Sequence, residues 1–247
     1  MKITKYENGI FGLRPIIEAI HSGKEIDTLF IQKGLKGETF SELWELVRSN
    51  RINYKHVPVE KLNRLTRKNH QGVFAFISPI LFHKTANVIP QLFEDGKTPL
   101  ILVLDRITDV RNFGAIVRTA ECSGVNAVIV PEKGSAAING DAMKTSAGAL
   151  ASMPICREFN LKATIKFLKE CGLQIVGCTE KTSQLIYEVN YQLPTAIIMG
   201  SEEDGISEEY LKQCDFKTKI PLVGAIDSLN VSVSAGVILY EAIRQRQ

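Results

Sequence analysis

The sequence predicts an α/β protein in two parts, a small N-terminal α/β domain over residues 1–77 and a C-terminal domain over residues 98–247 built on a parallel sheet. A chain of 247 residues suits two modest domains better than one large one. Residues 78–97 include Pro79 and Pro90 and show no sustained periodicity, which favours a linker. Beyond the linker, short apolar runs alternate with helical segments, a pattern typical of a buried parallel sheet.

In the first part, apolar spacing predicts helices and strands in mixed order. The first helix carries Pro15 in its first turn, where proline is tolerated. The predicted elements are helices at Gly12–His21 and Phe40–Val47, and strands at Ile26–Ile31, Ile52–Val57 and Gly72–Ile77. Before the last strand lies a basic segment, which is either a nucleic-acid contact or a solvated helix end. Its cations are Lys61, Arg64, Arg67 and Lys68.

The second part contains apolar runs that read as buried strands. Because such runs are apolar on both faces, the strands are predicted to lie between layers of helices. In a sheet of this kind the ligand site lies at the carboxyl ends of the strands, so the residues after each run are the candidates for function. The runs are Leu100–Leu104, Ala127–Val130, Leu173–Val176 and Ala196–Met199.

The first run leads into a helix that carries Asn112, Gly114 and Arg118. Phe113, Ile116, Val117 and Ala120 form its core stripe, and Arg118 projects away from that stripe. Gly114, one turn earlier, is predicted to leave bare backbone and room for a substrate in front of the guanidinium. The alternatives are a solvated arginine and a helix-capping asparagine.

The fourth run ends in a turn in which Gly200 and Gly205 bracket three carboxylates, Glu202 among them. Glycine permits a tight turn and the close approach of a ligand, although an acidic turn into a helix is the simpler interpretation. The chain has no Rossmann or Walker glycine pattern and no His-Glu-x-x-His or Gly-x-Ser-x-Gly motif. All four histidines precede residue 98, which argues against a Ser–His hydrolase.

The last thirty residues open with a short apolar strand from Ile220 and a glycine-containing loop, and then enter a helix. The first turns of that helix hold almost only Ser, Asn, Val, Ala and Gly. Small side chains and free N–H groups allow the close approach of a ligand, with Ser228 and Ser232 as hydrogen-bonding groups. Tight packing against a neighbouring helix explains the pattern equally well.

Composition sets the remaining limits. Five cysteines without metal-ligand spacing fit reduced thiols and a cytoplasmic location. The N-terminus lacks the apolar run of a signal peptide, and no apolar run is long enough to span a membrane. A net charge of +3 does not by itself indicate a nucleic-acid partner.

Taken together, three motifs resemble those of the SpoU, or TrmH, branch of the SPOUT superfamily, which are RNA ribose 2′-O-methyltransferases. They are Asn112-x-Gly114-x-x-x-Arg118-x-Ala120, Gly200-x-Glu202-x-x-Gly205, and Ile220-Pro221 with Ser228-Leu229-Asn230-Val231-Ser232-Val233. The segment His70–Val73 resembles the end of the L30e-like RNA substrate-binding domain of that branch. One departure lies at Gly9–Leu13, where the family often has a histidine. The resemblance covers nearly the whole chain.

The resemblance implies a catalytic domain with a trefoil knot, a homodimer formed through the knotted region, and no metal. It also implies S-adenosylmethionine as the cofactor, held by backbone groups and apolar walls where the loops after Val176, Met199 and Ile220 meet. The implied cofactor residues are Thr179, Met199, Gly200, Ile220, Leu222 and Leu229.

For catalysis, the resemblance places Arg118 at the centre, oriented together with the ribose by Asn112, Glu202, Ser228 and Asn230. Since a guanidinium is effectively always protonated, Arg118 is expected to stabilise developing alkoxide charge while phosphate or water takes the proton. Arg64, Arg67 and Lys68 are the expected RNA contacts. The expected substrate is a guanosine of 23S rRNA. The alternatives are tRNA, a non-catalytic ribosome-assembly factor and a generic nucleotide-binding enzyme.

Overall fold

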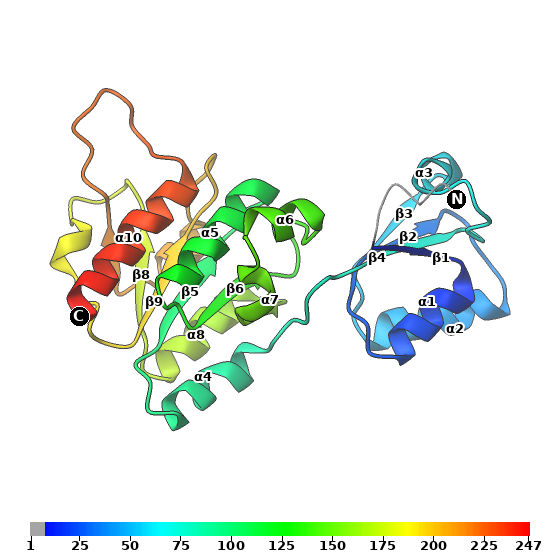
Figure 1. Ribbon diagram of the computed structural model, residues 1–247, viewed down its shortest axis with the longest axis horizontal. Helices are drawn as coiled ribbons and strands as arrows, with labels where there is room; N and C mark the ends of the chain where they lie inside the picture. The colour runs from blue at the N-terminus through cyan, green and yellow to red at the C-terminus, as the bar shows by residue number, and fades with distance from the viewer. Residues whose placement is uncertain (1–7) are drawn as a thin grey trace. The chain divides into compact units, whose positions relative to one another are not determined.

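The computed structural model describes residues 8–247 and divides them into two compact units, with the boundary between Leu81 and Phe82 (Figure 1). The N-terminal residues 1–7, where the sequence lacks a signal-peptide run, lie outside the described residues. No helix among the described residues is long and apolar enough to cross a membrane.

The first unit is a mixed four-stranded sheet in the order β1-β4-β2-β3. Strand β4 pairs antiparallel with β1 and β2, while β2 and β3 are parallel. The strands are β1 Gly9–Phe11, β2 Ile26–Gln32, β3 Tyr54–Val57 and β4 Val73–Ile77, and the helices are α1 Leu13–His21, α2 Glu38–Ser49 and α3 Val59–Leu65. All five elements predicted for this part are present. Strand β1 and helix α3 were missed because elements of three and seven residues are too short to show a clear apolar periodicity.

Alternation along β2 divides the core of this unit between the two faces of the sheet. Leu29 and Ile31 pack with α1 and α2, whereas Phe30, between them, packs with Leu62 of α3 and with Phe74. Successive strand residues point to opposite faces, so each face of the sheet acquires its own apolar cluster and its own covering helices.

The second unit is a six-stranded sheet in the order β10-β8-β9-β5-β6-β7, and every neighbouring pair of strands is parallel. Its strands are β5 Leu100–Leu104, β6 Ala127–Pro131, β7 Ile155–Glu158, β8 Gln174–Cys178, β9 Thr195–Met199 and β10 Phe216–Thr218. The four apolar runs are the four central strands, as predicted. The edge strands β7 and β10 were missed because they are only partly buried and lack a continuous apolar run.

Helices cover both faces of this sheet. Helices α4, α8 and α9 contribute to an apolar cluster with Ile101 and Val103 of β5, while α5 and α10 pack against each other in front of the sheet in Figure 1. The helices are α4 Thr85–Glu94, α5 Val110–Cys122, α6 Gly140–Thr145, α7 Ala149–Ser152, α8 Leu161–Glu170, the 3₁₀ turn η1 Ile186–Glu188, α9 Glu208–Leu211 and α10 Val231–Arg246. The parallel α/β class is confirmed, and the trefoil knot stays a prediction.

The predicted linker at 78–97 needs a correction, because half of it, Thr85–Glu94, is helix α4. Ile89 and Leu92 of this helix are buried in the core of the second unit. The Thr85 N–H donates to the Glu158 carboxylate at 2.8 Å, which ties the start of the helix to β7. Pro90 lies inside the helix, and its presence in the sequence led us to predict irregular structure.

Candidate active site

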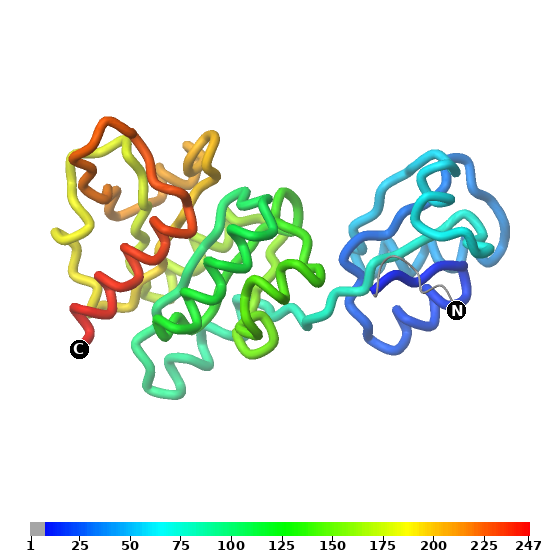
Figure 2. The backbone as a smooth tube through the Cα atoms, turned by 45° about the horizontal axis from the view of Figure 1, so that its top comes forward, coloured from blue at the N-terminus to red at the C-terminus, as the bar shows by residue number. Residues whose placement is uncertain are grey.

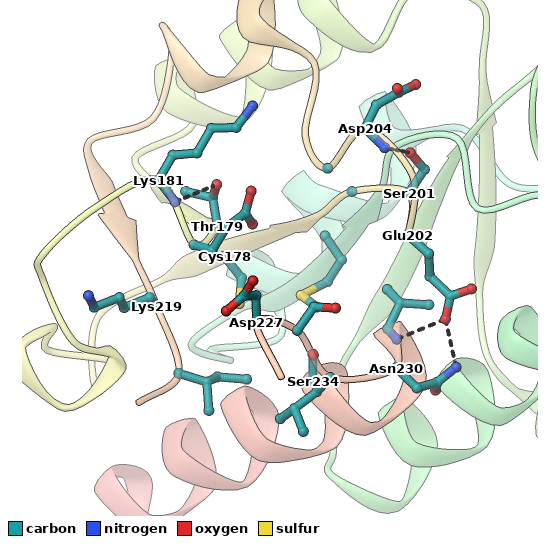
Figure 3. Close-up of a pocket in the computed structure, with 18 of the residues that line it drawn as sticks. Cys178, Thr179, Lys181, Ser201, Glu202, Asp204, Lys219, Asp227, Asn230 and Ser234 are labelled. Carbon is teal, nitrogen blue, oxygen red and sulfur yellow. Dashed lines mark hydrogen bonds between the residues drawn. The ribbon is translucent and has the colours of Figure 1, made fainter. Parts of the chain in front are cut away.

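A main cleft of about 690 Å³ opens at the carboxyl ends of β8, β9 and β10 and at the start of α10 (Figure 3). Its position agrees with the rule for parallel sheets. Lys181 and Lys219 lie at one end of the cleft, and Glu202 and Asn230 at the other. All six predicted cofactor residues line it: Thr179, Met199, Gly200, Ile220, Leu222 and Leu229.

The ends of the strands form the base of the cleft. Met199 is buried at the end of β9, and Thr179, just beyond β8, donates its N–H to the Thr218 carbonyl at 2.8 Å. The cleft's volume falls within the roughly 300–1,000 Å³ of small-molecule sites, and its mixture of apolar side chains and backbone groups suits an adenosine. The described residues therefore fit S-adenosylmethionine as a ligand.

The opposite wall is the loop of residues 219–230, which runs from β10 to α10 (Figure 2, orange to red). Every residue from 221 to 230 is exposed. The predicted strand from Ile220 is corrected, since β10 ends at Thr218 and Ile220 follows it. Ser228 also lies in this loop, before the helix, where it lines the main cleft.

Asn230 joins the three motifs. Its side-chain amide donates to the Glu202 carboxylate at 2.7 Å and to the Asn112 side-chain oxygen at 3.0 Å. Its own side-chain oxygen caps α10, accepting from the Ser232 N–H at 3.0 Å and from the Ser232 hydroxyl. The Val231 N–H donates to the same Glu202 oxygen at 3.3 Å. The carboxylate thus lies at a helix N-terminus, where negative charge is stabilised.

Asn112 does not cap its helix, which removes one of the simpler interpretations. The cap of α5 is Asp109, whose carboxylate accepts the Asn112 N–H at 2.7 Å. The amide side chain of Asn112 is therefore available to the network with Asn230. Three residues predicted from separate motifs, Asn112, Glu202 and Asn230, are held together by hydrogen bonds.

Arg118 does not join that network. It is exposed on α5 and lines neither the main cleft nor the second cleft beside it. Six residues separate it from Asn112, which is about 9 Å of helix rise and a different helix face. The open surface predicted beside Gly114 is wrong. A side chain at Gly114 would meet Thr145 Cβ at 2.8 Å and the Ala142 carbonyl at 3.0 Å, because α6 packs there.

Gly200 is required by its own loop. A Cβ at this position would lie 2.0 Å from the Gly205 carbonyl carbon and 2.2 Å from the Ile206 nitrogen. The loop folds back on itself, with the Gly205 N–H donating to the Ser201 carbonyl at 3.0 Å. We predicted that glycine makes room for a ligand here, but the space is taken by backbone.

Asp105 and Arg106, directly after β5, hold the loop of residues 200–207 in place by hydrogen bonds. The sequence analysis missed both. Buried Asp105 accepts the N–H and the hydroxyl of Ser207, each at 2.7 Å. Arg106 donates to Asp204 at 2.8 Å and to the Gly205 carbonyl at 3.1 Å. Both residues follow a predicted strand, so the strand-end rule that led to Asn112 could have found them.

Arg106 holds an uncommon backbone conformation, with φ of 58°. A non-glycine residue in this left-handed region is strained, and such strain collects at functional sites. Partial burial lowers the pKa of its guanidinium, but the ion pairs with Asp105 and Asp204 outweigh that effect and hold the pKa above its usual value. The guanidinium that fixes the loop therefore keeps its positive charge.

Cys178 is the thiol that lines the main cleft. Burial, with a smaller contribution from the nearby Glu180 carboxylate, raises the pKa of this thiol to about 12. Since the thiolate is the nucleophilic form, Cys178 is not a nucleophile at neutral pH. Among the described residues, no group of three or more His, Cys, Asp or Glu side chains is placed to hold a metal ion.

The basic segment lies on the first unit and is exposed at Lys61, Arg64, Arg67 and Lys68. The Lys61 ammonium lies 5.0 Å from the Phe30 ring centroid, and the Lys68 ammonium 5.9 Å from that of Phe11. Two of the four cations are thus held over aromatic rings with their heads open to solvent.

The turn that follows is fixed by His70. Its Nδ1 accepts the Gly72 N–H at 3.0 Å, so Nε2 carries the proton and donates to Asn63 at 3.0 Å. Gln71 and Gly72 both have positive φ, and the Gln71 side chain accepts the Leu13 N–H at the start of α1. The motif predicted at His70–Val73 is therefore a structural turn.

Comparison with known proteins assigns both units. Residues 99–240 match the family described as SpoU rRNA Methylase, and residues 10–82 match RNA 2′-O ribose methyltransferase substrate binding. The chain belongs to the SpoU rRNA methylase family. It is an RNA methyltransferase of the TrmH/SpoU type, a family that uses S-adenosylmethionine. The resemblance found in the three sequence motifs is confirmed.

Individual relatives agree with this assignment. A protein of Staphylococcus saprophyticus named as a TrmH family tRNA/rRNA methyltransferase is 38% identical, covering 96% of this chain and 95% of the relative. The SpoU methyltransferase AviRb from Streptomyces viridochromogenes, solved with AdoMet, is 25% identical over 96% of this chain and 90% of its own, with a TM-score of 0.61. The A. aeolicus TrmH/SpoU tRNA modifying enzyme is 34% identical over 65% and 83%, with a TM-score of 0.56.

Proposed function

We propose that this enzyme methylates a ribose 2′-hydroxyl in structured RNA, and that the nucleotide is a guanosine of 23S rRNA. The observation that carries the proposal is the network of Asn112, Glu202 and Asn230 at one end of the main cleft. Amide and carboxylate groups of this kind can orient a hydroxyl for in-line displacement. The description of the family matched by the first unit, which names 2′-O ribose methylation, also supports it.

S-adenosylmethionine supplies an electrophilic methyl group on a sulfonium. The six lining residues Thr179, Met199, Gly200, Ile220, Leu222 and Leu229 would hold the cofactor in the main cleft. When bound, the cofactor would supply the methyl group: the 2′-oxygen would bond to the methyl carbon as the bond from that carbon to sulfur breaks, and the hydroxyl proton would pass to a phosphate oxygen or to water. Asn112, Glu202 and Asn230 orient the ribose, with Ser228 contributing from the loop.

Arg118 acts from the RNA side in this proposal. It binds the phosphate next to the target ribose and stabilises the alkoxide charge that develops on the 2′-oxygen. Its exposed position on α5, outside both clefts, leaves it open to a macromolecular substrate. A guanidinium suits this task because it presents a fixed fork of donors to phosphate oxygens.

The decisive experiment maps ribose methylation in rRNA and tRNA from cells with and without the gene. A single 23S rRNA guanosine that loses its methyl group in the deletion, and regains it when purified enzyme and S-adenosylmethionine are added, supports the proposal. A site in tRNA would correct the substrate and keep the chemistry. If wild-type enzyme transfers no methyl group to either RNA, the non-catalytic alternative replaces the proposal.

We also assign RNA recognition to the basic segment of the first unit. Replacing Arg64, Arg67 and Lys68 together by Ala should weaken RNA binding and flatten its dependence on salt, because each lost phosphate contact removes up to about one unit of slope. Binding of S-adenosylmethionine should not change. Titrations at several salt concentrations measure both quantities. An unchanged RNA affinity and salt slope would place recognition elsewhere.

A homodimer in the cytoplasm completes the proposal. Six of the twelve large apolar side chains that are exposed among the described residues lie on the loop before α10 and on α10 itself, and such a concentration favours a protein–protein contact. They are Leu222, Val223, Ile226, Leu229, Val233 and Tyr240. Sedimentation of the wild-type chain and of a Val223→Asp, Ile226→Asp variant tests the association. All five cysteines are free, as is usual in a reducing compartment.

A further inference from the structure

A second cleft of about 390 Å³ adjoins the main cleft on the far side of Glu202. Its lining includes Arg106, Thr108, Asn112, Glu202, Glu203 and Val231. The carboxylate of Glu202 borders both clefts, and Asn112 belongs to the second one. Its volume lies within the range of small-ligand sites.

This arrangement bears on where a substrate nucleotide would lie. If the ribose is held by Asn112, Glu202 and Asn230, the methyl donor lies on one side of it in the main cleft. The base attached to that ribose then has the second cleft beside it. Ile107 and Val231, both almost fully buried, form the apolar part of the lining of that cleft.

The charges of the second cleft do not suit a phosphate. Four carboxylates line it, and the one cation among its described lining residues, Arg106, is already bonded to Asp204 and to the Gly205 carbonyl. Phosphate in such surroundings would meet uncompensated negative charge. A neutral group that presents N–H donors would gain from the same surroundings. The carboxylates are Asp109, Glu202, Glu203 and Asp204.

Most of these acids already have partners. Asp204 is bonded to Arg106, Asp109 caps α5, and Glu202 accepts from Asn230. Among the described residues, the exposed Glu203 carboxylate and the Thr108 hydroxyl make no hydrogen bond or ion pair. Glu203 is thus the acceptor that the folded loop leaves available at this cleft.

Guanine matches that acceptor. Its Watson–Crick edge carries the N1–H and the 2-amino group side by side, and one carboxylate can accept both. We propose that the second cleft binds the base of the nucleotide to be methylated, and that Glu203 selects guanine by accepting from its N1–H and 2-amino groups. This inference rests on the proposed function and goes beyond it by naming the residue that reads the base.

The test uses an RNA fragment spanning the nucleotide mapped in the deletion strain, made with guanine or with hypoxanthine, which lacks the 2-amino group. The enzymes are wild type, Glu203→Gln, and Glu208→Gln, which removes an equal charge from an exposed acid on α9 outside both clefts. Wild type should prefer guanine over hypoxanthine by about tenfold in kcat/KM, the lower end of the range for a bidentate contact, because hypoxanthine keeps the N1–H. Glu203→Gln should lose about that factor on guanine and most of the preference, while Glu208→Gln should keep both.

The other possible results overturn either the inference about Glu203 or the proposed function, and they can be told apart. An equal rate on guanine and hypoxanthine in wild type overturns the inference, and so does a mapped target base other than guanine. Because Glu203 also borders the main cleft, S-adenosylmethionine affinity is measured for every variant. A weaker affinity in Glu203→Gln would assign this carboxylate to the cofactor and overturn base selection. Absence of methyl transfer by wild type on all RNAs would instead refute the proposed function.

Discussion

The two loops that border the main cleft are built in opposite ways. Residues 200–207 are fixed by internal backbone bonds and by Asp105 and Arg106, which follow β5. Residues 221–229 are exposed throughout, and none of them makes a hydrogen bond with another described residue. The difference indicates that the side carrying Glu202 is preorganised before ligands arrive. We expect the side that would cover the cofactor, residues 221–229, to gain its contacts when a ligand or partner binds.

The largest expected effect lies outside both loops. Arg118→Ala should lower the methyl-transfer rate by roughly 10²–10³, the usual loss when one charge-stabilising donor is removed. Cofactor affinity should stay near that of wild type, because Arg118 lines neither cleft. Single-turnover assays and calorimetry measure the two quantities. A variant with near wild-type turnover would remove Arg118 from the chemistry.

The next prediction compares a glycine in each loop. Gly200→Val should cost about 1–3 kcal/mol of stability, as overpacking does, because its Cβ would clash with the backbone at Gly205 and Ile206. Cofactor binding should fall with it. Gly224→Val is the matched control, since nothing lies within 4 Å of a Cβ there. Thermal unfolding and calorimetry should separate the two variants, and equal behaviour would contradict the contrast between the loops.

A smaller effect is expected from Arg106→Ala. The ion pair with Asp204 is partly exposed, and buried Asp105, the other partner of Arg106, keeps its two hydrogen bonds from Ser207, so stability should change by only about 1 kcal/mol. Turnover should still fall by about tenfold, because the loop that positions Glu202 loses two of its hydrogen bonds. This loss is smaller than the roughly 10²-fold that a misplacement of 1 Å can cost. Lys162→Ala breaks an exposed pair with Glu209 outside both clefts and serves as control. A change in stability without loss of turnover would make Arg106 purely structural.

The smallest expected effect is a change in amide hydrogen exchange when the cofactor binds. Adding S-adenosylmethionine should slow amide hydrogen exchange across residues 221–229, where no native bonds protect the backbone. The amides of Gly205 and Ser207, already bonded to Ser201 and Asp105, should change little. Exchange followed by mass spectrometry resolves the two loops. Equal protection of both on binding would show that the first loop is not preorganised.

The four central strands could be predicted because a strand buried on both faces must be apolar at every residue, as Leu100–Leu104 is. The same rule directed attention to the strand ends, where Asn112, Glu202 and Asn230 do meet. The strand-end rule could also have pointed to the position of Arg106, but not to its role, which depends on a left-handed backbone and on contacts almost 100 residues away in the sequence. Spacing along the chain carries no such information.

Two glycines show a related limit of prediction from the sequence. The sequence marked Gly114 and Gly200 as places without a side chain, and this was informative in both cases. It gave no indication of what fills the space, which is helix α6 at Gly114 and the loop's own backbone at Gly200. The absence of a Cβ predicts close approach, and only the fold identifies the group that approaches.

The protonated state of Cys178 has a consequence for the enzyme's own survival. S-adenosylmethionine is an alkylating agent, and thiolates are among the side chains that such reagents attack most readily. With its pKa raised by burial, this thiol stays protonated at neutral pH. If the cofactor binds in the main cleft as proposed, we expect the sulfur that borders it to be protected from methylation by the enzyme's own reagent.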